Sequence, residues 1–174
     1  HGRHLLRCLE FHQHRSSGMA ETDVGILIAD DEKPAREELS FLLQGLLPEA
    51  SLTTAKDGDD ALSLLRESDF DVVFLDIEMP GKDGLQVATK ILERPSPPRI
   101  VFATAYSEHA VEAFRLSALD YLVKPVRQDR LEQTLDKLRE EIDQRDGVQK
   151  LLWSRKAQKL WAESSDERWV LLDY

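Results

Sequence analysis

The sequence predicts an α/β fold with a doubly wound parallel sheet that helices cover on both faces. Short apolar runs alternate five times with amphipathic helical segments. The runs are continuous rather than alternating, which is typical of strands buried on both faces. Apolar residues make up 41% of the 174 residues, enough for one domain of ordinary size plus extra segments.

The first strand and helix are the most clearly marked elements. The apolar run at 24–30 predicts a buried strand. Residues 33–47 predict a helix, and Pro34 fits its first turn because a missing N–H costs no hydrogen bond there. Its apolar face consists of Ala35, Leu39, Leu42, Leu43 and Leu46.

The next two pairs of elements are shorter. Residues 52–55 predict a strand, and residues 58–66 predict a helix with apolar side chains on one face. Residues 72–75 predict a third, buried strand, and residues 84–92 a third helix. Several prolines, of which Pro95 is the first, end that helix before the next strand.

The last two pairs complete the alternation. The fourth strand is expected at 100–103, and Ser107 is a suitable N-cap for a helix that ends at Arg115. Residues 119–123 predict the fifth strand, and a last helix is expected from about residue 127 to residue 145.

Charge and cysteine content exclude several classes of protein. The formal net charge of −10 makes the chain a poor nucleic-acid binder by itself, since contacts to phosphate need Lys and Arg. No apolar run approaches the roughly 20 residues of a membrane span. The single cysteine, Cys8, precludes an intramolecular disulfide, so we expect a cytoplasmic protein.

Polar residues follow four of the predicted strands. Because the carboxyl ends of parallel strands meet at one edge of an open α/β sheet, we expect these side chains to converge there. Three carboxylates, one hydroxyl and one ammonium are the groups needed to hold a divalent cation and to transfer a phosphoryl group. They belong to Asp30, Asp31, Asp76, Thr104 and Lys124.

The acidic residues predict a site for Mg²⁺ (or Mn²⁺). Asp31 and Asp76 can supply oxygen ligands with Asp30 close by, and three like charges repel one another unless a cation neutralises them. Asp76 ends the central strand and is the best nucleophile candidate, giving an aspartyl phosphate. Lys124 and Thr104 are placed to contact the phosphoryl oxygens.

Taken singly, these residues also have simpler interpretations. A pair of aspartates is often a solvated turn, and an aspartate at a strand end is often a helix cap. The glycines Gly81 and Gly84, which follow Asp76, would let the backbone pass close beneath a site. No G-x-G-x-x-G or Walker loop is present, so the dinucleotide-binding and P-loop interpretations lack a phosphate cradle.

Four segments together resemble a response-regulator receiver domain over roughly residues 22–145. They are Asp30-Asp31-Glu32, the stretch from Leu75 to Gly84, Thr104-Ala105, and the stretch from Tyr121 to Pro125. The resemblance implies the flavodoxin-like (βα)5 fold with strand order 2-1-3-4-5. It also implies phosphorylation by a partner sensor histidine kinase and a phosphorylation-dependent homodimer.

The resemblance assigns a role to each site residue. Asp76 is the implied phosphoacceptor, and Asp30 and Asp31 are the implied metal acids. Tyr121 is the implied aromatic switch, although its simpler interpretation is a half-buried tyrosine of an edge strand. The remaining implied roles are a metal-ligating backbone carbonyl at Glu78 and phosphoryl contacts from Thr104 and Lys124.

A narrower resemblance concerns the output of the domain. The segments 29–39, 103–106 and 110–122 are similar to receivers of the LytR/AlgR type, which usually carry a C-terminal LytTR DNA-binding domain. We therefore expect a receiver at 19–146. Residues 147–174 are expected to be a linker and the truncated start of a DNA-binding domain, and residues 1–18 an artificial extension.

Three functions from different classes remain open at this point. The first is a phosphorylatable receiver that controls transcription. The second is an enzyme, a phosphatase or phosphotransferase with an aspartate nucleophile, although such enzymes carry the nucleophile on the first strand. The third is a signalling adaptor, either phosphorylatable or no longer phosphorylated, and the complete set of site residues argues against the unphosphorylated form.

Overall fold

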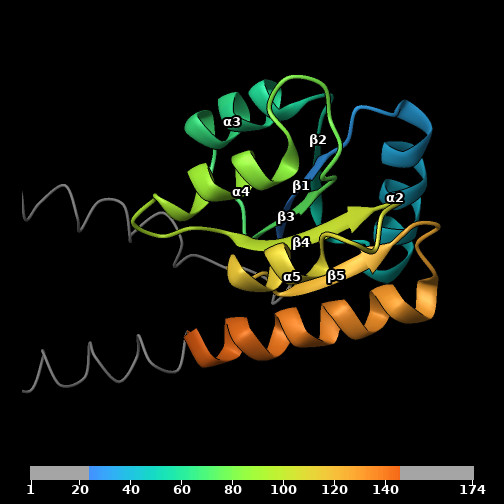
Figure 1. Ribbon diagram of the computed structural model, residues 1–174. Coiled ribbons are helices and arrows are strands. Elements are labelled where there is room, and N and C mark those ends of the chain that lie inside the picture. Colours follow the sequence, from blue (N-terminus) through green and yellow to red (C-terminus); the bar gives the residue numbers. More distant parts are fainter. Residues whose placement is uncertain (1–23, 146–174) are drawn as a thin grey trace, which may run out of the picture. The chain divides into compact units, whose positions relative to one another are not determined.

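The computed structural model describes residues 24–145, which contain a five-stranded parallel sheet and its helices (Figure 1). The strand order β2-β1-β3-β4-β5 confirms the predicted flavodoxin-like topology. The sheet belongs to a compact unit that ends at Glu132, and residues 133–145 belong to a second unit. The predictions for residues 1–18 and 147–174 lie outside the described residues.

The observed elements follow the predicted order. The strands are β1 Gly25–Ala29, β2 Ser51–Ala55, β3 Val72–Leu75, β4 Arg99–Thr104 and β5 Asp120–Val123. The helices are α2 Lys33–Leu46, α3 Gly58–Glu67, α4 Gly84–Leu92, α5 Ala110–Arg115 and a last helix at 128–145. Apart from α5, the predicted boundaries are within one residue of those observed.

The strands bury their side chains on both faces of the sheet. Leu27 and Val73 belong to the core that α3 and α4 cover, and these two helices lie side by side in Figure 1. Ile28 and Phe74 point to the opposite face, where they line a pocket together with Leu39 of α2. Each such fully buried side chain contributes about 1.5–3 kcal/mol of hydrophobic stabilisation, which explains the continuous apolar runs.

The start of α5 differs from the prediction. Ser107 is not its N-cap: the helix begins at Ala110, and its N-cap is His109, which makes no side-chain capping bond. The Ser107 carbonyl instead accepts a bond from the Ala110 N–H at 3.4 Å, so Ser107 opens a turn before the helix. A serine before an apolar segment is typical of both structures, and the sequence does not separate them.

The described residues include no helix that combines the length and the apolarity needed to cross a membrane.

Candidate functional site

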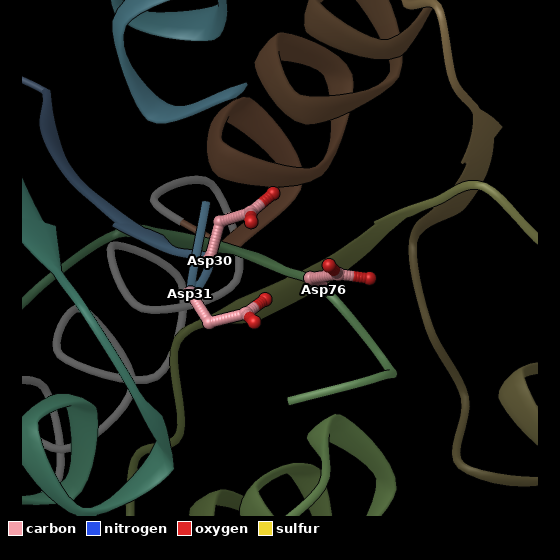
Figure 2. A group of neighbouring side chains, drawn as sticks. All are labelled: Asp30, Asp31 and Asp76. Atoms are coloured by element: carbon pink, nitrogen blue, oxygen red, sulfur yellow. The ribbon is translucent and has the colours of Figure 1, made fainter. Parts of the chain in front are cut away.

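Three aspartates gather at the carboxyl edge of the sheet (Figure 2). Ligand oxygens of Asp30, Asp31 and Asp76 all lie within 4.8 Å of one another. Asp30 and Asp76 are buried, at 5% and 7% exposure, while Asp31 is exposed. Two of the three carboxylates are therefore fixed in protein, and the third opens to solvent.

Backbone pairing places these residues. The Asp30 N–H donates to the Ala55 carbonyl at 3.1 Å, and the Asp76 N–H donates to the Ala29 carbonyl at 2.9 Å. These bonds extend the parallel ladders one residue beyond β1 and β3. The Lys124 N–H likewise donates to the Thr104 carbonyl at 2.8 Å, so β5 delivers Lys124 to the same edge.

Lys124 bridges two of the aspartates. Its Nζ lies 2.5 Å from Asp30 Oδ2 and 3.1 Å from Asp76 Oδ2. Burial lowers the pKa of Lys124, but the neighbouring carboxylates outweigh this effect and the pKa is raised overall. The ammonium therefore stays charged at neutral pH and compensates part of the negative charge of the site.

The carboxyl group of Asp76 is held in an unfavourable environment for its charge. Its pKa is raised, chiefly by burial and further by the charge of Asp30, while Lys124 and the hydroxyl of Thr104 act in the opposite direction. Burial without full compensation disfavours an ionised carboxylate. A bound cation would relieve this cost, because its charge stabilises the ionised form.

Thr104 ends β4, Gly81 lies in the loop after β3, and Gly84 begins α4. Thr104 is fully buried, and its Oγ1 accepts a bond from the Tyr106 N–H at 3.4 Å. A Cβ at Gly84 would lie 2.1 Å from the Asp76 carbonyl oxygen, so only glycine permits this close approach. Gly81 adopts φ +76°, a left-handed conformation that also favours glycine.

Tyr121 occupies a partly buried position on the edge strand β5. Its hydroxyl donates to the main-chain carbonyl of Tyr106, and its ring centroid lies 6.5 Å from that of Phe102. This placement fits the simpler interpretation of a half-buried tyrosine. The hydrogen bond also connects β5 to the loop that follows Thr104, so a movement of one segment would displace the other.

The structure adds residues that the sequence did not single out. The Glu78 carboxylate raises the pKa of the Tyr106 hydroxyl, and His109 Nε2 lies 3.8 Å from Glu78 Oε1. Arg36 Nη1 donates to the main-chain carbonyl of Asp30 at 2.7 Å. Residues from separate segments make these contacts, and no short motif marks them.

The donor set suits a hard divalent cation. Mg²⁺ prefers oxygen ligands and is usually held by one or two carboxylates, with waters and phosphate oxygens in the other positions. The three aspartates provide these carboxylates, and Glu78 stands two residues beyond Asp76 in the same loop. The raised pKa of Asp76 is consistent with the fit, because burial and the charge of Asp30 disfavour its ionised form, which a bound cation would stabilise.

We expect Asp76→Asn to raise the free energy of unfolding of the metal-free protein at pH 7, by about 1 kcal/mol, the size of a typical single substitution. The pKa of Asp76 is raised above its usual value in the folded state. The stability that this group contributes is therefore complete below its unfolded pKa and is lost as pH rises through the folded pKa. Asparagine avoids this loss.

Urea unfolding in a chelator at several pH values measures the effect. The gain should shrink toward pH 3, where the aspartate is protonated. Asp129→Asn is the matched control, because Asp129 forms an exposed pair with Arg127 at 3.2 Å and should change stability little. A less stable Asp76→Asn protein at pH 7 would contradict the interpretation.

Comparisons with known proteins agree with this geometry. Residues 26–136 match the sequence model described as the response regulator receiver domain. The chain is 48% identical over 115 residues to the positive alginate biosynthesis regulatory protein of Pseudomonas aeruginosa, covering 66% of this chain and 46% of that protein. It is 40% identical over 112 residues to the sensory transduction protein LytT of Bacillus subtilis, covering 64% and 46%.

Solved structures are also similar. The response regulatory domain of protein mrkE from Klebsiella pneumoniae superposes with a TM-score of 0.65 at 38% identity, covering 70% of this chain and 99% of that one. The response regulator TrrA of Thermotoga maritima, solved in complex with Mg²⁺-BeF, gives a TM-score of 0.60 at 36% identity, covering 66% and 98%.

The similarity to the curated relatives concerns part of their length. The chain spans about half of the P. aeruginosa and B. subtilis regulators that it matches. These relatives confirm the predicted resemblance to regulators of the LytR/AlgR type. The match over residues 26–136, together with the observed strand order, shows that this chain belongs to the response regulator receiver domain family.

Proposed function

We propose that Asp76 accepts a phosphoryl group from a partner sensor histidine kinase in a Mg²⁺-dependent reaction. The observation that carries the proposal is the Lys124 ammonium between Asp30 and Asp76, beside a third carboxylate within 4.8 Å. This arrangement combines a nucleophile, a fixed positive charge and oxygen ligands for a cation. Response regulators are signalling proteins, so no metabolite is turned over.

Each residue has a stated task in this proposal. The carboxylates of Asp30, Asp31 and Asp76 and the backbone carbonyl of Glu78 would hold Mg²⁺ (or Mn²⁺). When bound, the ion would supply positive charge to the carboxylates and to the phosphoryl oxygens. The related TrrA was solved with Mg²⁺-BeF, which supports the same use of this site here.

The transfer itself needs little covalent chemistry from the protein. An oxygen of Asp76 attacks the phosphorus, and the new O–P bond forms as the P–N bond to the kinase histidine breaks. The electron pair of the broken bond stays on the imidazole nitrogen. Lys124 neutralises charge on the phosphoryl oxygens, and the Thr104 hydroxyl donates to one of them.

The output is proposed from the relatives. One relative is the transcriptional regulatory protein LytR of Staphylococcus aureus, and the chain spans about half of that protein as well. We propose that residues 19–146 form the receiver and that residues 147–174 form a linker and the start of a LytTR DNA-binding domain. In this proposal the protein acts in the cytoplasm.

Mg²⁺ binding tests the site directly. We expect calorimetric titration of the metal-free protein to show a single Mg²⁺ site. The ion should also stabilise the fold by roughly 2.7 kcal/mol at one hundred times Kd. Asp31→Ala should weaken Mg²⁺ binding by at least about tenfold. Loss of a residue that only orients a metal ligand already lowers affinity by about that factor, and loss of the ligand itself should lower it further.

The control for this titration is Asp69→Ala. Asp69 is exposed and precedes β3, whereas the site lies beyond the other end of that strand. The control should bind Mg²⁺ with unchanged affinity. Equal affinity in the wild type and Asp31→Ala would show that the cation is bound elsewhere.

Phosphorylation is proposed to drive a homodimer through the exposed face of α5 and β5. Phe114 and Val111 are 84% and 63% exposed, and Val123 is 47% exposed, which leaves an apolar face for a second copy. Tyr121 lies on the same strand and links it to the loop after Thr104. Rotation of Tyr121 inward would then carry the change from Thr104 to this face.

Sedimentation velocity with beryllofluoride and Mg²⁺ measures this step. We expect partial dimerisation, because a shift from 1:99 to 99:1 needs roughly 5.5 kcal/mol of differential binding. Phe114→Ala should reduce the dimer, and Phe41→Ala, which removes an exposed phenylalanine of α2, should not. Identical distributions with and without the mimic would exclude the coupling for this chain.

A further inference from the structure

We propose that Arg36 is a positioning residue that aims the carboxylate of Asp31 at the cation. This inference rests on the proposed function, because it concerns the same acidic site. Its basis is the 2.7 Å hydrogen bond from Arg36 Nη1 to the main-chain carbonyl of Asp30. The bond joins α2 to the turn that carries the metal acids.

Arg36 is the residue that can hold this carbonyl. β1 ends at Ala29, and the ladder bond beyond it uses the Asp30 N–H and not the Asp30 carbonyl. Pro34, four residues later, has no N–H to donate. The N-cap of α2, Glu32, makes no side-chain capping bond, so a helix cap does not fix the turn either. The guanidinium group of Arg36 reaches back from the first turns of α2 and supplies the donor.

The carboxylate of Asp30 is already fixed by other contacts. Its Oδ1 accepts a bond from the Glu32 N–H at 2.9 Å, and its Oδ2 accepts from Lys124 Nζ at 2.5 Å. The carboxylate of Asp31 is exposed and points from the end of β1 toward Asp76 (Figure 2). Among residues 24–145, no hydrogen bond or ion pair is recorded for this carboxylate.

The direction of Asp31 is therefore set by its main chain. The carbonyl of Asp30 and the N–H of Asp31 lie in one rigid peptide plane. On one side, the Asp30 N–H is held by the Ala55 carbonyl at 3.1 Å, and on the other, the Asp30 carbonyl is held by Arg36. These two bonds limit rotation about Asp30 and so restrain the N–Cα bond of Asp31. The Glu32 N–H, which donates to Asp30 Oδ1 at 2.9 Å, restrains the peptide that follows Asp31. Together the three bonds limit where the Cα–Cβ bond of Asp31 points.

The two adjacent acids are therefore held in place in different ways. Asp30 is fixed by its side chain, and Asp31 by the backbone that Arg36 restrains. Loss of the Arg36 contact would leave every metal-ligating atom present but would free Asp31 to sample other directions. Cation affinity would fall because the binding energy must then also order this carboxylate.

Calorimetric titration of metal-free protein with Mg²⁺ tests the inference, together with thermal unfolding in a chelator. Arg36→Met removes the donor and keeps the aliphatic stem, and it should weaken binding about tenfold, as is usual for residues that orient metal ligands. Arg36→Lys keeps a cationic donor and should recover part of the affinity. If the variants were only less stable, their Mg²⁺ affinities would not fall in the order wild type, Arg36→Lys, Arg36→Met.

Lys33→Met is the matched control. Lys33 lies on the same helix in an exposed pair with Glu37 at 3.5 Å, so the variant loses one positive charge without touching Asp30. Its affinity should equal that of the wild type or rise slightly, because loss of a positive charge favours cation binding. An equal loss in both variants would show that the effect is not specific to the contact with Asp30 and would overturn the inference. Unchanged affinity in Arg36→Met, or in Arg36→Gln if the former fails to fold, would overturn the inference. Absence of Mg²⁺ binding to the wild type would instead overturn the proposed function.

Discussion

Replacing Lys124 by alanine should slow phosphoryl uptake from a small acyl phosphate by about 100- to 1000-fold. Removal of one fixed positive group from a site where negative charge develops typically has this effect. Lys124 is suited to this task because its Nζ already lies 3.1 Å from Asp76 Oδ2. The rate is measured by intact mass spectrometry during incubation with saturating Mg²⁺.

The same substitution should destabilise the metal-free protein at neutral pH. Asp30 and Asp76 would lose the cation that lies 2.5 Å and 3.1 Å from them. Leaving a buried polar group without its partner costs about 1–3 kcal/mol, and more where it is charged. Mg²⁺ should restore part of the lost stability, because it supplies positive charge to the same carboxylates.

Lys90→Ala provides the control for both measurements. Lys90 pairs with Glu93 at 3.4 Å, and both side chains are largely exposed. Such a pair contributes at most about 1 kcal/mol to stability. Lys90 lies in the last turn of α4, which carries none of the three aspartates. A Lys124→Ala protein that is phosphorylated as fast as the Lys90→Ala protein would exclude Lys124 from the transfer.

Most of the fold was predictable because its signal is local. A strand buried on both faces must be apolar throughout, so runs such as 72–75 stand out between helices. Parallel strands bring their carboxyl ends together, so the sequence alone predicts that Asp30, Asp76 and Lys124 lie close to one another. The strand order, in contrast, came from the family resemblance, since the runs do not determine which strands are neighbours.

The features that the sequence did not predict are contacts between side chains and backbone groups of different helices, strands and loops. Arg36 looks like a surface residue of an amphipathic helix, and nothing in its spacing shows that it bonds the Asp30 carbonyl. The interactions of Tyr106 and His109 with Glu78 join the segments that follow β4 and β3, which are distant in the sequence. Ser107 was wrongly predicted as an N-cap because serine suits a turn equally well.

The central claim is that Asp76 is the phosphoacceptor, and incubation with a small acyl phosphate and Mg²⁺ tests it most directly. We expect the intact mass to rise by one phosphoryl group, peptide mapping to place that group on Asp76, and a chelator to abolish the gain. Asp76→Asn should gain nothing, whereas Asp129→Asn, an exposed acid after β5, should react like the wild type. A phosphoryl group on Asp76→Asn, or on any other residue of the wild type, would contradict the assignment.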